Sequence, residues 1–321
     1  MKKKIVILHN QICNQTLDEI DVLSQRDLVK EACIQSGFDV MCRTVGDDIQ
    51  KDILAVASEN PDLVFNLVES TWGKGELIYF APAILNSLKI PYTGVPLDAL
   101  FVTTNKVLAK KIMQLNHLPT ADFFSMDEIQ KLDDQKTYIA KPIWEEASVG
   151  ISSDYIFQPA ETDKLKNLSH LSSAHYFIET FIEGREFNVS MLADRNTVEV
   201  LPPAEMMFSS YFDDKHKIVG YKAKWDQTSE EYQQTHREFS TLEHTPALKD
   251  KLIEICVSTW NVFNLKGYAR IDFRVDEKDN VFILEINGNP CISEDSGFIA
   301  AAAQAGYSTQ TVINRIIENI S

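Results

Sequence analysis

Apolar and polar residues alternate in two neighbouring stretches near the C-terminus, 267–273 and 282–290. A period of two predicts strands with one buried face, and the polar residues between them predict the turn of an antiparallel hairpin. Arg270 and Asp272 project from one face of the first strand, and Glu285 and Asn287 share a face of the second. Two carboxylates and an amide oxygen beside an arginine suit a divalent cation that also touches phosphate. A salt bridge on the solvated face of a sheet is the plainer alternative.

The first third of the chain predicts an open parallel sheet. Apolar runs predict strands at 5–8, 38–45 and 62–68, separated by a helix that ends before Gly37 and a helix at 48–58. This alternation implies parallel strands with helices on both faces. The turn after the first strand has no GxGxxG, which disfavours a dinucleotide site. The polar loop 66–76 follows the third strand, at the edge where such sheets bind ligands.

The remainder of the chain predicts a mixture of helices and strands. Helices are expected at 76–88, 105–117, 161–168, 246–265, 295–305 and 309–319. Strands are expected at 90–94, 123–124, 138–140, 155–157, 187–193 and 197–207. The long polar stretch 208–245 is typical of a mobile lid or binding loop. The loop 145–150 suits backbone N–H groups near phosphate, although such a loop is more often only a hairpin.

Composition narrows the class of protein. A chain of 321 residues is large for one core, so two or three domains are expected. The net charge of -16 argues against nucleic acid or an anionic membrane as a partner. Five cysteines without a CxxC pair predict neither a disulfide framework nor a zinc site. No long apolar run or signal peptide is visible, so we expect a cytoplasmic protein.

Eight short motifs follow one another along nearly the whole chain: 90–94 (IPYTG), Asn105-Lys106 with Lys110, Ala140-Lys141-Pro142, Ser148-Val149-Gly150, 179–186, Ala223-Lys224, 267–272 and 285–287. In this order they resemble the ATP-grasp superfamily, in its D-alanine–D-alanine ligase branch. The resemblance implies an ATP-grasp fold of mixed α/β and α+β class, with ATP between two antiparallel sheets. Its parts would be an N-terminal open parallel α/β domain (1–103), a central α+β subdomain (104–184) and a C-terminal antiparallel-sheet α+β domain (185–321) with the lid loop 208–245.

The resemblance also implies a set of site residues. ATP would be bound by Lys106, Lys141, Ser148, Val149, Glu179, Phe181, Ile182, Glu186 and Lys224. One or two Mg²⁺ ions, or Mn²⁺, would be held by Asp272, Glu285 and Asn287. Catalytic positions would fall on Arg270, Lys224, Ser148 and Gly288. Arg270 would stabilise charge on the transferred phosphoryl group.

The implied reaction is ATP-dependent ligation of a carboxylate and an amine through an acyl phosphate. A free carboxylate cannot act as an acyl donor, because its leaving group would be oxide, so ATP must phosphorylate it before the amine attacks. The acyl phosphate must be shielded from water, which is a reason for a lid. The partners implied are small carboxylate and amine substrates and, as in D-alanine ligases, a second copy of the chain.

The residues at the positions where the family binds its amino-acid substrates differ from the family pattern. The loop 9–15 lacks the glutamate that grips the first D-alanine in the family, and Asp18 and Glu19 follow only where a helix begins. Three residues of the family pattern are replaced: a serine by Ala147 in the phosphate loop, a tyrosine by Trp225 in the lid and a glycine by Cys291 after Pro290. We therefore expect a substrate other than D-alanine. Substrate contacts are expected among His9, Glu69, Trp225, Asn289, Cys291 and Ser293.

Three other hypotheses stay open: a true D-alanine–D-alanine ligase, a non-catalytic ATP-binding sensor or partner protein, and a phosphotransferase that stops at the phosphorylated product. Retention of the residues expected to bind Mg²⁺ argues against the sensor, because nucleotide binding alone would tolerate their loss. Cys291 is more simply an inert packed thiol, since a lone cysteine seldom acts as a nucleophile. His9 is more simply a capping or core residue.

Overall fold

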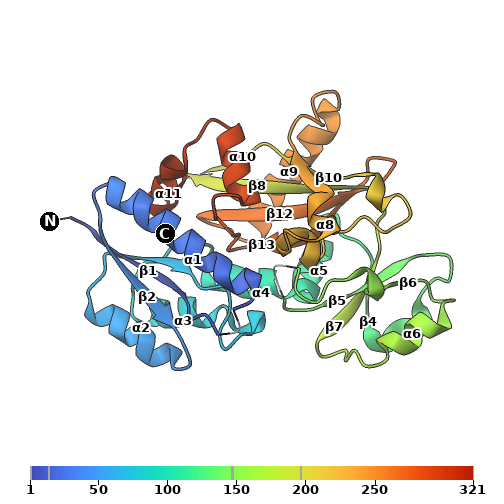
Figure 1. Cartoon of the computed structure of the whole chain (residues 1–321), viewed down its shortest axis with the longest axis horizontal. Helices are drawn as coiled ribbons and strands as arrows, with labels where there is room; N and C mark the ends of the chain where they lie inside the picture. The colour runs from blue at the N-terminus through green and yellow to red at the C-terminus, as the bar shows by residue number, and fades with distance from the viewer. Residues whose placement is uncertain (1, 14, 146–147, 196, 321) are drawn as a thin grey trace.

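The computed structural model describes residues 2–13, 15–145, 148–195 and 197–320, so the substitution noted at Ala147 lies outside the described residues. The described chain forms three sheets with helices packed against them (Figure 1). The strands are β1 (Lys4–Asn10), β2 (Asp39–Val45), β3 (Leu63–Leu67), β4 (Phe123–Ser125), β5 (Tyr138–Pro142), β6 (Ile156–Phe157), β7 (Tyr176–Thr180), β8 (Arg185–Asp194), β9 (Thr197–Val200), β10 (Ala204–Phe208), β11 (Thr235–Glu238), β12 (Tyr268–Val275) and β13 (Val281–Asn287).

The α-helices are α1 (Leu17–Gln35), α2 (Ile49–Ser58), α3 (Phe80–Ser87), α4 (Leu97–Thr104), α5 (Lys106–Leu115), α6 (Thr162–Leu168), α7 (Tyr221–Trp225), α8 (Glu230–Gln233), α9 (Pro246–Val262), α10 (Gly297–Gln304) and α11 (Thr309–Glu318). Short 3₁₀ turns are η1 (Gly75–Leu77), η2 (Met126–Lys131), η3 (Ser153–Tyr155) and η4 (Ser210–Phe212). Among the described residues, none of these helices is both long and apolar enough to cross a membrane.

The N-terminal sheet is parallel, with the strand order β2-β1-β3. Successive side chains of β1 point to opposite faces, and both faces are buried. Ile5 and Ile7 pack with the buried side of α1, whereas Val6 and Leu8 pack with α2 and α3. The predicted parallel sheet with helices on both faces is confirmed. The strand expected at 90–94 is reduced to a single bridge between Tyr92 and Val64.

The central sheet is antiparallel, with the order β4-β7-β5-β6. One of its faces is buried by Tyr138, Phe157 and Ile178 against Leu168 of α6. Ile139 and Lys141 are two residues apart on β5, so both project from the other face. Glu179 of β7 pairs directly with Ile139 and therefore projects from that face as well. The sheet thus has an apolar side and a polar side, and the polar side lines a cavity.

The C-terminal sheet has the order β11-β10-β8-β12-β13, with β9 also paired to β8. The hairpin predicted from the alternating pattern is formed by β12 and β13. Asp272 stands opposite Glu285 in this hairpin and opposite Asn188 of β8. Figure 1 shows this sheet above the central sheet, with α9 behind it and α10 and α11 at its end nearest the N-terminal sheet.

The single strand expected at 197–207 is wrong. The structure contains β9 and β10 there, separated by Leu201-Pro202-Pro203. Proline has no N–H to donate to a strand ladder, so two in succession end β9 and let the chain turn before β10. The leucine before them still donates its N–H to the Ser190 oxygen at 2.9 Å.

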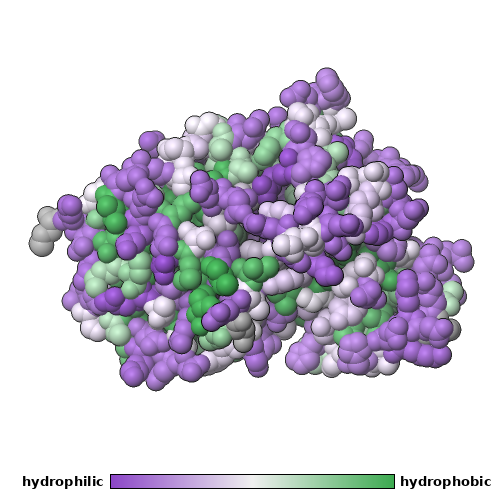
Figure 2. Space-filling view, viewed as in Figure 1, coloured by the Kyte–Doolittle hydropathy of each residue, from purple (hydrophilic) through white to green (hydrophobic). Residues whose placement is uncertain are grey.

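The segment 208–245, expected to be a lid loop, contains regular structure. It holds η4, the short helices α7 and α8, and β11, which is the edge strand of the C-terminal sheet. Residues of both short helices line the larger of two cavities described below. Figure 2 shows hydrophilic residues over most of the face seen in Figure 1, with hydrophobic residues gathered near the centre, between the N-terminal part and the rest.

Candidate active site

Two adjoining cavities lie where the three sheets meet. The larger encloses about 770 Å³ and is lined by both antiparallel sheets and the 208–245 segment. The smaller encloses about 360 Å³ and is lined by the start of α1, the loop after β3 and the chain after β13. Four residues line both cavities: Lys224, Trp225, Arg270 and Cys291. A molecule in one cavity and a molecule in the other would therefore meet at these side chains.

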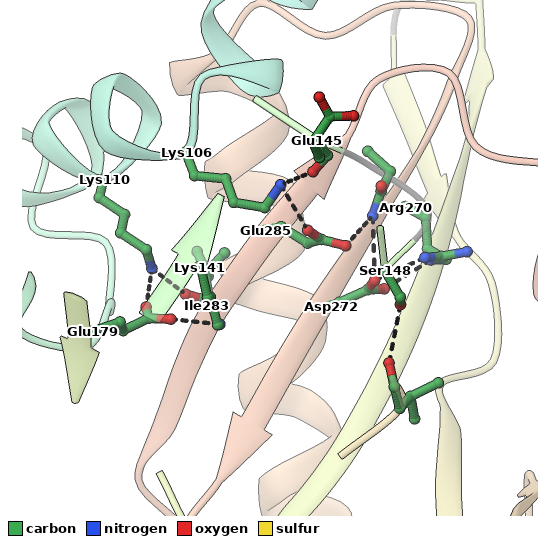
Figure 3. Close-up of polar contacts among 12 residues, drawn as sticks. Lys106, Lys110, Lys141, Glu145, Ser148, Glu179, Arg270, Asp272, Ile283 and Glu285 are labelled. Carbon is green, nitrogen blue, oxygen red and sulfur yellow. Dashed lines mark hydrogen bonds and ion pairs between the residues drawn. The ribbon is translucent and has the colours of Figure 1, made fainter. Parts of the chain in front are cut away.

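The hairpin brings its polar side chains together as the sequence predicts. The Nε and Nη2 of Arg270 each donate a 2.7 Å hydrogen bond to the Asp272 carboxylate (Figure 3). Asn188 of β8 donates to Asp272 at 2.9 Å, and Asn287 donates to Asp272 at 3.2 Å and to Glu285 at 3.5 Å. The head groups of the three predicted metal ligands thus lie within hydrogen-bonding distance of one another.

These three residues fit a Mg²⁺ ion by their chemistry. Asp272 and Asn287 are buried; the two carboxylates, of Asp272 and Glu285, line the larger cavity, and Asn287 lines the smaller one. No group of three His, Cys, Asp or Glu side chains suited to a metal exists in the described part of the chain. The set offers two carboxylates, so the amide oxygen of Asn287 and phosphate oxygens would have to complete it. Asn287 would then present its amide oxygen, rather than its Nδ2, to the ion.

Positive charges surround Glu285. Lys106 Nζ lies 3.5 Å from Glu285 Oε2 and also donates to the main-chain oxygen of Glu145. Burial opposes ionisation of Glu285, but Lys106 and Arg270 outweigh it and hold its pKa at about 2. Burial raises the pKa of Asp272, with Glu285 adding to the effect against the Arg270 guanidinium. The site therefore concentrates both signs of charge around the polar end of the hairpin.

A second buried cluster lies on the central sheet. Glu179 forms ion pairs with Lys110 and, at 2.5 Å, with Lys141 (Figure 3). Lys110 and Glu179 are each 1% exposed. Burial lowers the pKa of the Lys110 ammonium, whereas the two ammonium groups overcome burial and hold the pKa of Glu179 below its usual range. Lys110 was not among the binding residues expected from the sequence, although Lys110 lies one helical turn after Lys106.

Most of the other residues expected to bind ATP line the larger cavity. Ser148, Phe181, Ile182, Glu186 and Lys224 line it, together with Lys141 and Glu179. Glu186 is paired at 3.0 Å with Arg274, and burial raises its pKa. Burial lowers the pKa of Lys224, and Arg270 lowers it further. Val149 lies instead on the wall of the smaller cavity.

The smaller cavity is rich in acids. Asp18 and Glu19, in the first turn of α1, line it together with Glu69 and Glu145. Asp18 accepts a 2.7 Å hydrogen bond from Tyr221 of α7. The sequence placed no acid in the loop 9–15 and put Asp18 and Glu19 at the start of a helix; the structure has them in that first helical turn, on the wall of the smaller cavity. One feature of the sequence could have indicated that Asp18 and Glu19 line a cavity. They follow directly after the loop of β1, at the edge of the parallel sheet where ligands bind.

The remaining substrate candidates divide between the cavities. Trp225 and Cys291 line both, Glu69 and Asn289 line the smaller, and Ser293 lines the larger. The Cys291 thiol donates to Asp21 Oδ2 at 3.0 Å, and burial raises its pKa. These positions agree with contact between the 289–293 chain and a bound molecule.

Three predicted residues line neither of these cavities: His9, Gly288 and Lys106, whose ammonium group contacts Glu285 and the main-chain oxygen of Glu145 instead. His9 is 3% exposed, and its Nδ1 lies 2.8 Å from the Asn10 oxygen, so it is a core residue. Gly288 packs against Val95 and α4, because a Cβ at this position would lie 2.6 Å from Val95 Cγ2 and 3.1 Å from Thr103 Oγ1. The structure therefore gives Gly288 a packing role, and the catalytic role expected of it stays a prediction.

Comparisons with known proteins agree with this geometry. A family model described as "D-ala D-ala ligase C-terminus" matches residues 116–318. A D-alanine–D-alanine ligase of Carboxydothermus hydrogenoformans is 27% identical and covers 95% of this chain and 96% of its own. An uncharacterized protein, y4sG of Sinorhizobium fredii, is 28% identical over 80% of this chain and 74% of its own.

Solved structures show the same fold. A D-alanine–D-alanine ligase from Bacillus anthracis complexed with ATP superposes with a TM-score of 0.75 at 17% identity, covering 99% of this chain and 97% of its own. The VanG D-Ala:D-Ser ligase of Enterococcus faecalis superposes with a TM-score of 0.73 at 17% identity, covering 99% of each chain. The family model spans well over half of the chain, and the fold is the ATP-grasp fold. The chain therefore belongs to the D-alanine–D-alanine ligase family of ATP-dependent carbon–nitrogen ligases.

Proposed function

We propose that this ligase joins a carboxylate to an amine through an acyl phosphate, and that its substrate pair differs from two molecules of D-alanine. The observation that carries the proposal is the junction of the two cavities. Lys224 and Arg270 stand there, between a wall that carries the residues expected to bind ATP and an acidic wall suited to an ammonium group. Cations at such a junction would stabilise charge that develops on a phosphoryl group in transfer.

In this proposal the larger cavity holds ATP. Lys141 and Lys106 act as point charges on phosphate or base nitrogen, and the Glu179–Ile182 strand end reads the adenine edge. Asp272, Glu285 and Asn287 would hold Mg²⁺, which would neutralise phosphate charge when bound. Residues 104–184 and 185–321 act as the two halves that grip the nucleotide, and 1–103 contributes the acidic wall.

The chemistry then needs two displacements. A carboxylate oxygen of the first substrate forms a bond to the γ-phosphorus of ATP while the bond to ADP breaks. The nitrogen of the second substrate, as a free amine, attacks the acyl carbon, loses a proton and expels phosphate. Arg270 stabilises the negative charge of both transition states, and Lys224 closes over the phosphoryl group. The 208–245 segment excludes water, which would otherwise hydrolyse the intermediate.

The side chains around the smaller cavity support a substrate other than D-alanine. Cys291 occupies the position where the resemblance leads us to expect glycine, and its thiol is fixed by Asp21. Trp225, where a tyrosine is expected, has no hydroxyl to offer. Both residues line both cavities, so their side chains shape the volume where an amino acid would react.

A D-alanine–D-alanine ligase is the second candidate. The relative from Carboxydothermus hydrogenoformans, which covers nearly the whole chain, carries that name. The acids Asp18 and Glu19 on the smaller cavity also favour it, because they restore an ammonium-binding wall that the sequence had not suggested.

The test is release of ADP and phosphate from Mg-ATP with D-alanine, other D- and L-amino acids, and small amines offered in pairs. The proposal expects release to depend on one acid–amine pair and to be low with D-alanine alone. Efficient synthesis of D-alanyl-D-alanine by the wild-type protein would refute the proposed substrate difference. Release of phosphorylated acid without any requirement for an amine would instead indicate a phosphotransferase.

A further inference from the structure

The edge strand β11 carries two buried polar atoms without partners. Thr235 and Arg237 are two residues apart, so they project from one face of the strand, and both line the larger cavity. The Oγ1 of Thr235 and the Nε of Arg237 are buried and make no hydrogen bond within the described chain. Buried polar atoms are almost always paired, so this face of β11 is incomplete without a ligand.

The Arg237 guanidinium also has no carboxylate counter-ion among the described residues. Its Nη1 donates a long 3.4 Å hydrogen bond to the main-chain oxygen of Asp295. Within the described ranges no carboxylate oxygen lies within 4.0 Å of it, in contrast to Arg270 and Arg274, which each hold a carboxylate. Burial lowers the pKa of Arg237, and Arg270 lowers it further. Three guanidinium groups therefore line the same cavity, and Arg237 is the one that has no carboxylate partner in the described part of the chain.

The place of Arg237 separates it from the proposed nucleotide contacts. Its side chain lies against the segment that follows β13, since a Cβ on Gly297 would come within 3.6 Å of its Nε. Cys291 and Ser293 of that segment line the same cavity. The adenine and phosphate contacts proposed above come from α5, the central sheet, the hairpin and α7, and none of them comes from β11. Arg237 thus stands on the amino-acid side of the reacting centre.

We propose that Arg237 binds a carboxylate carried by the amine substrate and so makes the enzyme selective for amines that bear one. This inference rests on the proposed ligase function. A guanidinium matches a carboxylate with two parallel hydrogen bonds, and Thr235 can donate one more. The carboxylate is the α-carboxylate of an amino acid or a second, side-chain carboxylate; the shared chemistry is the same, and the test separates the two.

The experiment measures binding rather than turnover, by calorimetry with Mg²⁺ and a non-hydrolysable ATP analogue present. The probes are ethylamine, D- and L-alanine, and D- and L-aspartate. For the wild-type protein we expect at least one amino acid to bind and ethylamine to bind at least about tenfold more weakly. Arg237→Gln should weaken that amino acid about 10- to 100-fold and leave ethylamine unchanged, and Arg237→Lys should fall between.

The matched control is Arg195→Gln, which removes the same charge from an exposed turn outside both cavities. Circular dichroism and binding of the ATP analogue establish that each variant is folded. An equal loss for alanine and aspartate would assign the α-carboxylate, and a loss confined to aspartate would assign the side-chain carboxylate. The inference is overturned if Arg237→Gln binds every amino acid as the wild type does, if it weakens the ATP analogue instead, or if the wild type binds no amino acid.

The two proposals fail separately. Binding that depends on Arg237, in a protein that releases no ADP with any pair, would contradict the ligase function alone. ADP release with an amine–acid pair, unaffected by Arg237→Gln, would contradict only the carboxylate contact.

Discussion

The phenol of Tyr221 donates a 2.7 Å hydrogen bond to Oδ1 of Asp18, and this bond joins α7 to the first turn of α1. Both residues line the smaller cavity. A second bond, 2.9 Å from the hydroxyl of Ser148 to the Val219 oxygen, ties the same segment to the central sheet's loop. The 208–245 segment is therefore attached on two sides of the site, to the start of α1 and to the loop that follows β5.

Tyr221→Phe should loosen this closure. Without the hydrogen bond to Asp18, water reaches the acyl phosphate more often, so the ratio of ADP released to amide formed should rise severalfold above one. The ratio is measured by coupled ADP assay and product chromatography. Tyr211→Phe is the control, because Tyr211 lies in the same segment but contacts Lys215 rather than Asp18. An unchanged ratio in Tyr221→Phe would show that this bond does not control water access.

The same hydrogen bond sets a pH limit. Burial and Asp18 raise the pKa of Tyr221 from 10.0 to about 12. A raised pKa means that the fold favours the neutral phenol. The contribution of this phenol to the folding stability is therefore complete below pH 10.0 and is lost as the pH rises toward about 12. Ultraviolet difference titration of wild type against Tyr221→Phe should show one phenolate that forms late. In Asp18→Asn it should form earlier; a midpoint unchanged by that substitution would contradict the role of Asp18.

Lys110→Met should destabilise the protein. It leaves Glu179 buried with one cation in place of two, and breaking a buried ion pair costs about 3–5 kcal/mol. Urea unfolding followed by fluorescence measures the change in free energy. Lys111→Met, at the exposed neighbouring position of α5, is the control and should change it by less than about 0.5 kcal/mol. Equal effects of the two substitutions would mean that the Lys110–Glu179 pair adds nothing to stability.

Arg270→Ala should remove most of the activity with the active substrate pair. Loss of one donor that stabilises a developing anion lowers kcat by about 10²–10³-fold. Affinity for a non-hydrolysable ATP analogue should change far less, since Lys106, Lys141 and the adenine contacts remain. Steady-state kinetics and calorimetry separate the two effects. A variant with normal kcat and weak ATP binding would show that Arg270 binds the nucleotide rather than the transition state.

Cys291 should resist alkylation. Burial raises the pKa of its thiol, and the carboxylates of Asp21 and Glu69 raise it further, so little thiolate exists at pH 8. Iodoacetamide followed by peptide mass spectrometry should label the exposed Cys13 first in the folded protein. Both cysteines should react in urea. Equal labelling of Cys291 in the folded state would show that its thiol is accessible and ionised, in favour of a nucleophilic role.

Local periodicity in the sequence was sufficient to predict the hairpin and the parallel sheet that surround the site. The alternation at 267–273 and 282–290 predicted the hairpin, and with it the shared face of Arg270 and Asp272. The apolar runs of the first third predicted the parallel sheet. These predictions hold because the direction of a side chain along a strand depends only on its own backbone. The break between β9 and β10 was also readable from Pro202-Pro203, and was overlooked.

The tertiary structure decided which distant residues meet. Glu179 pairs with Lys110, which lies on another element, and Arg237 enters the cavity only because β11 joins the edge of the C-terminal sheet. Asp18 and Glu19 reach the smaller cavity through the packing of α1, while His9 and Gly288 turn into the core. Periodicity states which face a residue occupies, but not what packs against that face. The sequence alone determined the chemistry of the hairpin, and the packing of three sheets determined the shape and charge of the site around it.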